Sequence, residues 1–435
     1  EKFRPDFFKG RRVMKAFLSK MSNKPLDKKQ QLQNKLWDRG EASLHSVSAH
    51  CGQKFFCKKI FVIGSYGCGN RGDDAILQSI CEQFPQAQIS ATCGSYEKIS
   101  SFLPVKDVSC RLNEGFSLSV LLSMLKDSFG MFKEVFCCDV LMFGGGSLIH
   151  DLTPYNLPFL YLWQTLAKIF HKKVCYYCMG VGPVQKEGSK KLSRFYLKKA
   201  DDLSVRDYRG SAVCEELGIK AQLTADAAFG VKNKNACAGK TLQELGIKEK
   251  EYLCVTACQW FESSNFWKRK QMNFSEKEDN LAACIRELSR LFQKKVLFVP
   301  TVFHDALLGK RLQEKLSDID FEIVPEHWNC KQMAEVIENS FLLFGMRMHS
   351  IIFAARQKVP FIALLYDEKV TELLKRLDMV EYGISMEDMK PEKVQQMGNR
   401  VLERYSEIEN LLWKKTKYLE QDVKALSQML CEKYS

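Results

Sequence analysis

Arg347 and His349 lie two residues apart in the segment GMRMHS, directly after the apolar run Phe341–Phe344. Residues two apart on an extended turn can face the same ligand. An arginine fork binds two oxygens of a carboxylate or phosphate, and histidine is the side chain best suited to move a proton near neutral pH. The pair predicts a site that binds an anion and transfers a proton, although a lone histidine is more often structural.

Two further cations, Arg206 and Lys369, follow predicted strands. At a strand end Arg206 could bind a carboxylate or phosphate with its fork, or it could form a salt bridge to Asp207 or Asp226. Lys369 could meet a phosphate as a point charge, or it could be a solvated side chain. The sequence alone leaves both pairs of alternatives open.

A glycine-rich turn, Gly67–Gly72, matches the pattern G-x-G-x-x-G between a predicted strand and a predicted helix. Asp73 and Asp74 follow it, where a helix N-terminus would meet a dinucleotide's pyrophosphate. Two carboxylates would repel a diphosphate but would accept hydrogen bonds from neutral sugar hydroxyls. We therefore expect Asp73 and Asp74 to accept hydrogen bonds from a sugar; the alternative is that Asp73 only caps the helix.

A second glycine turn follows the apolar run Asp139–Phe143. Its first three residues are glycines, which let a backbone approach a ligand closely. The amides that follow could bind an anion at the start of a helix. We expect Gly145 and Gly146 to contact substrate, although such turns are common.

The elements that would position these residues alternate between strands and helices, which implies parallel sheets. The alternation stops at the Lys-, Asn- and Ala-rich segment 231–240 and then restarts. We expect an α/β protein with two Rossmann-like domains facing each other across a cleft, and ligands bound at the carboxyl ends of the strands. The expected division is a basic extension (1–57), a first domain (58–230), a second domain (241–390) and a C-terminal helical segment (391–435).

Composition narrows the function classes. The chain has 435 residues and a net charge of +13, but residues 1–59 hold 15 Lys and Arg against 5 Asp and Glu. The positive charge is therefore an N-terminal arm, which argues against a nucleic-acid-binding face. The arm could touch an anionic membrane surface or could be a solvated extension. No apolar run approaches the roughly 20 residues that span a bilayer.

Seventeen cysteines are scattered through predicted strands and helices, as expected of free thiols in a reducing cytoplasm. Cys175 and Cys178 form a CxxC motif inside a predicted strand. Positions three apart on a strand face opposite sides, so we expect these thiols not to meet. No cluster of metal ligands is apparent, and we expect neither a metal nor a cofactor.

The motifs together resemble the polysaccharide pyruvyl transferase family, over roughly residues 58–380. Any one of them is weak, whereas their order and spacing are specific. They are GNRGDDAIL (Gly69–Leu77), GGGSLIHD (Gly144–Asp151), MGVGP (Met179–Pro183), SVRD with DAAF, GMRMHSIIFAA and PFIALLYDEK.

The resemblance implies two Rossmann-type domains of the glycosyltransferase-B kind, and transfer of a pyruvyl group from phosphoenolpyruvate to a pair of sugar hydroxyls with release of phosphate. It implies that Arg206 and Arg347 bind the donor's carboxylate and phosphate, with Lys369 near the phosphate. His349 would be the general acid that protonates the enol carbon. Asn70, Asp73 and Asp74 would lie on the acceptor side, in the first domain.

Two other functions remain open. A nucleotide-sugar glycosyltransferase of the same architecture would need a carboxylate for the ribose, for which Glu368 and Glu372 are candidates. A catalytically silent sugar-binding homologue is suggested by Ala257–Phe261, where family members tend to carry an arginine and this chain reads ACQWF. The sequence also leaves open whether the chain is cytoplasmic throughout or peripheral at a membrane, and whether it forms a homo-oligomer.

Overall fold

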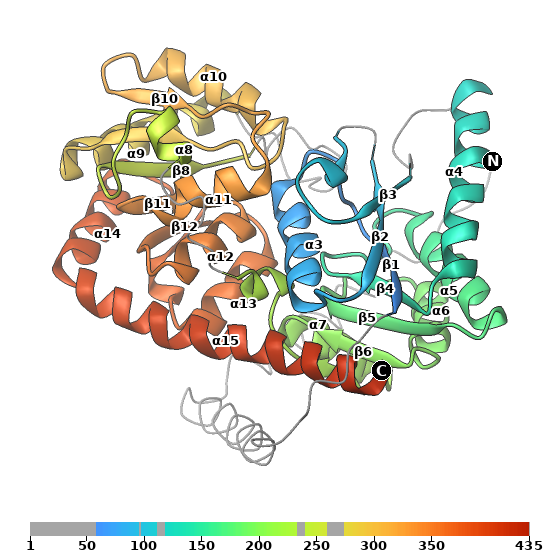
Figure 1. Ribbon diagram of the computed structural model, residues 1–435. Helices are drawn as coiled ribbons and strands as arrows, with labels where there is room; N and C mark the ends of the chain where they lie inside the picture. The colour runs from blue at the N-terminus through green and yellow to red at the C-terminus, as the bar shows by residue number, and fades with distance from the viewer. Residues whose placement is uncertain (1–57, 95–96, 111–117, 233–239, 259–273, 435) are drawn as a thin grey trace, which may run out of the picture. The chain divides into compact units, whose positions relative to one another are not determined.

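The computed structural model describes residues 58–94, 97–110, 118–232, 240–258 and 274–434 (Figure 1). The expected basic extension, residues 1–57, lies outside the described residues, and so does most of the expected linker at 231–240. No helix within the described ranges is long and apolar enough to cross a membrane.

The first sheet is parallel, with strand order β3-β2-β1-β4-β5-β6-β7. Its central strands are apolar runs buried on both faces, as parallel sheets covered by helices require. The strands are β1 (Lys59–Ile63), β2 (Gln88–Cys93), β3 (Lys106–Ser109), β4 (Val140–Gly144), β5 (Lys173–Met179), β6 (Asp202–Val205) and β7 (Gln222–Leu223).

Helices cover both faces of this sheet. One face packs under α3 (Arg71–Gln83) and the short turn η2 (Ala227–Gly230), and its core includes Ile60 and Val62. The other face, with Phe61 and Leu141, packs under an outer layer of helices. The outer layer consists of α4 (Leu118–Cys137), α5 (Asn156–Ile169), α6 (Glu187–Leu197) and α7 (Tyr208–Glu216) (Figure 1).

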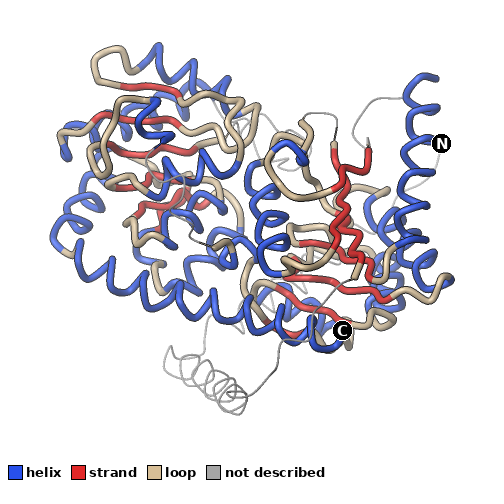
Figure 2. Tube along the Cα trace, viewed as in Figure 1, coloured by secondary structure: helices blue, strands red, loops and turns tan. Residues whose placement is uncertain are grey.

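The second sheet is also parallel, with order β10-β9-β8-β11-β12-β13. This sheet is the group of red strands at the left of Figure 2. Its strands are β8 (Tyr252–Thr256), β9 (Lys295–Phe298), β10 (Phe321–Ile323), β11 (Leu342–Gly345), β12 (Phe361–Leu365) and β13 (Gly383–Ser385). Its helices are α8 (Lys240–Glu244), α9 (Phe274–Phe292), α10 (Asp305–Lys315), α11 (Cys330–Glu338), α12 (Met348–Arg356), α13 (Glu368–Leu377) and α14 (Pro391–Glu403).

The last helix, α15 (Tyr405–Tyr434), joins the two sheets. Near its start, the Tyr405 hydroxyl donates to the Phe341 carbonyl of the second half at 2.8 Å. Further along, Ser427 is 2.8 Å from the Tyr177 hydroxyl of the first half, and Lys433 Nζ is 2.7 Å from Asp202. This helix therefore packs back onto the first half and helps to fix the two sheets relative to each other.

The expectation that Cys175 and Cys178 face opposite sides of their strand is wrong. The register of β5 against β6 shifts between Tyr176 and Met179, and Cys178 adopts a left-handed φ of 52°. This bulge turns both cysteines into the same apolar core, which also contains buried residues of α15. Both are free, fully buried thiols, and burial raises their pKa values, as expected of core residues rather than a redox pair.

Candidate active site

A cleft with about 840 Å³ of empty volume lies where the carboxyl ends of the two sheets meet. Its walls are the turns that follow β1, β4 and β6 in the first half, and β9, β11 and β12 in the second. This is the position at which open α/β sheets bind ligands. Eight of the residues singled out from the sequence line it: Asn70, Asp73, Gly145, Gly146, Arg206, Arg347, His349 and Lys369.

Backbone hydrogen bonds tie the two halves together at one side of the cleft. The Arg71 amide donates to the Thr301 carbonyl at 2.9 Å, and the Phe303 amide donates to the Gly69 carbonyl at 3.0 Å. Between them, Asn70 and Val302 form an isolated antiparallel bridge. The turn after β1 is thereby held against the turn after β9, so residues of both halves are fixed around one space.

Asn70, rather than Asp73, caps α3. Asn70 Oδ1 accepts from the Gly72 amide at 3.1 Å, and Asn70 Nδ2 donates to Asp73 Oδ2 at 2.8 Å. The alternative in which Asp73 serves only as the cap is therefore wrong, and its carboxylate lines the cleft. Burial raises the pKa of Asp73 to about 6, against the opposing effects of Arg206 and Lys369.

Asp74 does not reach the cleft. Its side chain is fully buried, accepts a hydrogen bond from the Gly67 amide at 3.0 Å, and lies 3.5 Å from Arg71 Nη1. Arg71 is also ion-paired to Glu97. Asp74 therefore holds the glycine turn in shape, and the expected contact between Asp74 and a sugar has no support in the structure.

The second glycine turn forms part of the cleft wall. Gly145 and Gly146 have left-handed φ values of 57° and 69°, which side-chain-bearing residues rarely adopt. A Cβ atom on Gly145 would lie 2.4 Å from Ile76 Cγ2, so the strand end packs directly on α3. Gly146 faces Asp73, because a Cβ atom there would lie 3.4 Å from Asp73 Oδ1.

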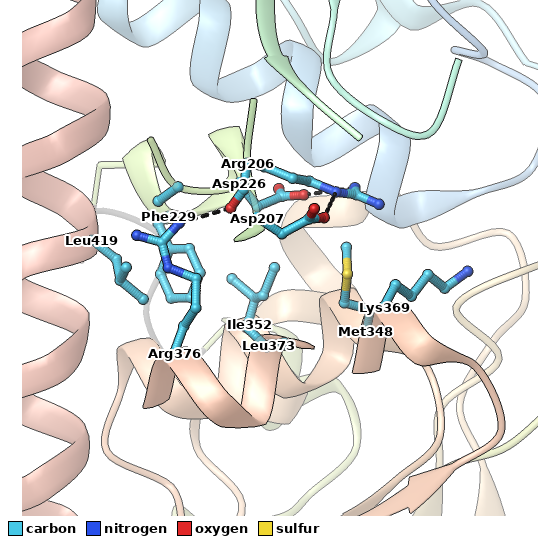
Figure 3. A pocket seen from close by; sticks show the side chains of 11 residues that line it. Arg206, Asp207, Asp226, Phe229, Met348, Ile352, Lys369, Leu373, Arg376 and Leu419 are labelled. Carbon is cyan, nitrogen blue, oxygen red and sulfur yellow. Dashed lines mark hydrogen bonds and ion pairs between the residues drawn. The ribbon is translucent and has the colours of Figure 1, made fainter. Parts of the chain in front are cut away.

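Arg206 lines the cleft and is also ion-paired (Figure 3). Its Nη1 donates to Asp226 Oδ2 at 2.9 Å, its Nη2 to Ser147 Oγ at 2.8 Å, and its Nε approaches Asp207 Oδ2 at 3.4 Å. Burial alone would lower the pKa of Arg206, but the two aspartates raise it. The guanidinium is therefore a permanent, oriented cation, and both predicted salt bridges exist.

Arg376, from α13, forms a hydrogen bond to the backbone of Arg206. Its Nη1 donates to the Arg206 carbonyl at 2.7 Å, and its Nη2 lies 3.4 Å from Asp422 of α15. Around it lies a smaller hollow of about 300 Å³ whose apolar lining includes Phe229 and Leu373 (Figure 3). This contact links the second half to the strand end that carries Arg206.

Arg347 is held by a carboxylate that the sequence analysis did not select. Its Nε and Nη2 donate to the two oxygens of Asp305, at 3.1 and 2.6 Å. Asp305 is fully buried and also accepts from the Val302 amide at 3.1 Å. The Arg347 side chain is 26% exposed, so its remaining Nη1 edge is available at the cleft.

His349 belongs to the second half but packs on the first turn of α3. A Cβ atom on Gly72 would lie 2.0 Å from His349 Nδ1, so only glycine leaves room for the imidazole. His349 Nε2 is 3.7 Å from Asp226 Oδ1 and is buried without a hydrogen bond. Burial, together with Arg206, Lys369 and Arg347, lowers the pKa of His349 to about 4, so the free protein holds a neutral imidazole.

Lys369 completes the cationic wall at the start of α13. Its Nζ lies 5.4 Å from the centre of the Tyr366 ring and 3.7 Å from Asp367 Oδ2. Burial alone would lower its pKa, whereas Tyr366 and Asp367 raise it. The ammonium is therefore charged at neutral pH, and its side chain is one-third exposed at the cleft.

Three residues that support the site were not predicted as site residues from the sequence: Ser147, Asp226 and Asp305. From the sequence, Asp226 was considered only as a possible salt-bridge partner of Arg206. Its contact with His349 joins residues 123 positions apart, and no local sequence pattern predicts that contact. Asp305 is the first residue of α10, seven positions after the end of β9, so a search of the residues directly after strands, which identified Arg206, does not reach it. The altered turn at Gln259-Trp260-Phe261 lies outside the described residues.

Within the described ranges, no group of three or more His, Cys, Asp or Glu could hold a metal ion.

The fold and the cleft define a two-domain α/β protein of the glycosyltransferase-B architecture. The chain is similar to UDP-GlcNAc 2-epimerase from Neisseria meningitidis, with a TM-score of 0.59 and 10% identity over 86% of this chain and 100% of the other. It is also similar to Anabaena HepE in complex with UDP and glucose, with a TM-score of 0.53 and 12% identity over 86% and 99%. Identities this low support the fold and nothing finer, and they confirm the predicted fold class.

Residues 70–368 match the family described as polysaccharide pyruvyl transferase. The chain is also 24% identical to the amylovoran biosynthesis protein AmsJ of Erwinia amylovora, over 395 residues that cover 81% of this chain and 94% of AmsJ. The chain therefore belongs to the polysaccharide pyruvyl transferase family, and it is a transferase of polysaccharide biosynthesis. The resemblance drawn from the motifs is confirmed.

Proposed function

We propose that the protein transfers a pyruvyl group from phosphoenolpyruvate to a pair of hydroxyls on a saccharide and releases phosphate. One observation carries the proposal: a neutral histidine lies among three cations. Arg206, Arg347 and Lys369 come from three different strand ends, and each of them lowers the pKa of His349. Such a wall suits a small, highly charged anion next to a proton-transfer group.

The donor matches this wall in charge. Phosphoenolpyruvate carries about three negative charges when its phosphate is fully ionised, and arginine forks bind both carboxylate and phosphate oxygens. Arg347 is oriented by Asp305 and Arg206 by Asp226, so little side-chain entropy is lost when the anion binds. Lys369 adds a point charge that suits the phosphate.

Binding of the anion would also change the state of His349. The three cations disfavour an imidazolium in the free protein. A bound trianion offsets their charge and leaves Asp226, 3.7 Å from Nε2, to stabilise the protonated ring. The donor thus raises the pKa of the acid that will act on it, and His349 becomes protonated only when donor is present.

The proposed reaction balances in protons and atoms when Asp73 acts only as a relay, taking a proton from an incoming hydroxyl and passing it to the departing phosphate. His349 gives its proton to the methylene carbon of phosphoenolpyruvate, and the adjacent carbon becomes cationic. One sugar hydroxyl adds to that carbon and loses its proton, the carbon–oxygen bond to phosphate breaks, and a second hydroxyl adds to form the ketal. One hydroxyl proton restores His349 and the other leaves with phosphate. The reaction involves no change of redox state and needs no redox cofactor.

The acceptor would lie against the first half. Asp73 and Gly146 lie next to each other in the cleft wall, and the Asn70 side-chain amide donates a hydrogen bond to the Asp73 carboxylate. Because burial raises the pKa of Asp73 to about 6, this carboxylate can accept a proton from an incoming hydroxyl more readily than an ordinary aspartate. Asp74 has no part in the proposal, since it lies outside the cleft.

The nucleotide-sugar alternative lacks its expected ribose carboxylate. Glu368 is 74% exposed and pairs with Arg209 at 3.0 Å. Glu372 pairs with Lys375 at 2.6 Å. Neither residue lines the cleft.

Thermal shift and calorimetry with phosphoenolpyruvate, UDP-glucose and UDP-N-acetylglucosamine distinguish a phosphoenolpyruvate donor from a nucleotide-sugar donor. At a ligand concentration of 100 times Kd, stabilisation is about 2.7 kcal/mol, which is readily measured. We expect phosphoenolpyruvate alone to stabilise the protein, and Arg347→Gln to remove the effect. Arg404→Gln is the matched control, because Arg404 pairs with Glu381 and Glu407 away from the cleft. Stabilisation by a UDP-sugar and none by phosphoenolpyruvate would overturn the proposal.

A further inference from the structure

The outer helices of the first half expose an unusual number of large apolar side chains. Six of the fifteen exposed large hydrophobic residues in the described part of the chain lie on α4, α5 and α6. The most exposed on each helix are Phe129 of α4 at 73%, Ile169 of α5 at 61% and Phe195 of α6 at 53%. Exposed hydrophobic residues scattered singly need no explanation, but a concentration on one layer does.

Ring contacts join the three helices to one another. Their exposed apolar side chains are here called the outer aromatic face: Phe129, Phe132 and Phe136 of α4, Leu162 and Ile169 of α5, and Phe195 of α6. Phe170, next to Ile169, packs edge-on against Phe132 and Phe136 of α4, with ring centres 5.5 and 5.2 Å apart. On the other side of α5, Tyr161 stacks on Tyr196 of α6 at 4.4 Å. The face therefore runs over α4, α5 and α6, on the opposite side of the sheet from α3 (Figure 1).

Lysines surround the outer aromatic face. Residues 126–199 contain 11 Lys and Arg against 5 Asp and Glu, a net charge of +6. The rest of the chain after residue 59 is net negative, so this layer is the basic part of the folded body. Lys172 Nζ lies 6.0 Å from the Phe136 ring centre and Lys199 Nζ 3.7 Å from that of Phe195. These two ammonium groups therefore lie over exposed aromatic rings of the face, so charge and apolar surface are next to each other.

We propose that the outer aromatic face docks the protein on an anionic lipid bilayer. Aromatic and aliphatic side chains would enter the boundary between headgroups and acyl chains, and the surrounding lysines would meet lipid phosphates. None of the residues of this surface lines the cleft, and the inference does not depend on the identity of the donor.

The chemistry of the face favours lipid over other partners. Protein–protein interfaces are depleted of lysine, whereas α4, α5 and α6 each contain at least one lysine. A nucleic acid would satisfy the lysines but would leave Leu162 and Ile169, which are 53% and 61% exposed, without an apolar partner. A bilayer surface satisfies both kinds of side chain at once. Its negative potential adds about 1 kcal/mol for each nearby lysine.

The test is co-sedimentation of the full-length chain with phosphatidylcholine vesicles, with and without phosphatidylglycerol. The apolar variant replaces the most exposed residue on each helix: Phe129→Ser, Ile169→Ser and Phe195→Ser. The control replaces three similarly exposed residues elsewhere, Leu307→Ser, Leu402→Ser and Trp413→Ser, which are 51%, 43% and 50% exposed. A charge variant, Lys172→Gln with Lys198→Gln and Lys199→Gln, leaves the apolar side chains in place and serves if the apolar variant does not fold.

We expect the wild type and the control to bind phosphatidylglycerol vesicles, and both face variants to bind about tenfold more weakly or less. The N-terminal arm is intact in every protein, so any binding through the arm is common to all. No binding by the wild type, or unchanged binding by a folded face variant, would overturn the proposal. So would equal loss in the control, or a wild-type dimer that the apolar variant splits without any change in vesicle binding.

Discussion

Asp226 Oδ1 lies 3.7 Å from His349 Nε2, while Oδ2 of the same carboxylate accepts from Arg206 Nη1 at 2.9 Å. One buried aspartate of the first half therefore contacts both Arg206 of that half and the histidine of the other half. Asp226 is itself held by the Ala228 amide, which donates to Oδ1 at 3.0 Å. The acid and the donor site can exist in this arrangement only when the two halves are together.

Donor binding should be accompanied by proton uptake. The pKa of His349 is lowered to about 4 in the free protein, so the ring is neutral at pH 7. A trianionic donor should raise this pKa, and the ring should take up as much as one proton. Calorimetry of phosphoenolpyruvate binding in two buffers of different ionisation enthalpy measures the number of protons. His349→Gln should bind donor with no uptake; equal uptake in both proteins would show that another group carries the proton.

The stability difference between wild type and His349→Gln should depend on pH in a defined direction. The pKa of His349 is lowered on folding from 6.5 to about 4, so the unfolded chain binds a proton first as pH falls. The wild type should therefore lose roughly 3 kcal/mol relative to the variant between pH 6.5 and pH 4. Asp73 is present in both proteins, so its opposite contribution largely cancels. Unfolding curves at several pH values measure the difference, and a gap that does not change with pH would mean that His349 is not buried in its neutral form.

Gly72→Ala should disable the site with little change in the fold. The new Cβ would lie 2.0 Å from His349 Nδ1, so the imidazole must move. We expect turnover to fall by about as much as on loss of a positioned acid, roughly 10²-fold or more. Gly188→Ala, in helix α6, is the matched control because nothing lies within 4 Å of its Cβ. Normal turnover in a folded Gly72→Ala protein would show that the imidazole position is unimportant.

Arg206→Lys should weaken donor binding although it keeps the charge. The guanidinium contacts Asp226, Ser147 and Asp207 with three different nitrogens, and an ammonium cannot reproduce that geometry. Calorimetry should show a higher Kd for phosphoenolpyruvate. Binding as tight as that of the wild type would show that Arg206 is not part of the donor site.

Much of the site could be predicted from the sequence, because the strands of a parallel sheet have their carboxyl ends at the same edge. Arg347 and Lys369 lie two and four residues after the ends of β11 and β12, and both line the cleft as this rule predicts. Asp74 was misplaced because adjacent helical residues point in directions about 100° apart. Asp73 faces the cleft, and its neighbour turns back to the Gly67 amide.

Contacts that depend on bulges or on distant segments could not be read from local patterns. Cys178 faces the same core as Cys175 because of a left-handed residue in β5, which period-two alternation does not anticipate. The contact of His349 with Gly72 joins the two halves, and neither local sequence encodes it. The exposed face of α4 to α6 was also missed, because its residues read as ordinary amphipathic helix until their burial is known.

The most direct test of the central claim is a transfer assay with phosphoenolpyruvate and saccharides that offer different hydroxyl pairs. Mass spectrometry follows formation of a pyruvate ketal, and a coupled assay follows phosphate. Wild-type protein should form the ketal and release phosphate in equal amounts. His349→Gln should keep its fold and most of its donor affinity, but its turnover should be slower by roughly 10²–10⁴-fold. Ketal formation by a folded His349→Gln protein at the wild-type rate, or hexosyl transfer from a UDP-sugar in place of ketal formation, would contradict the account.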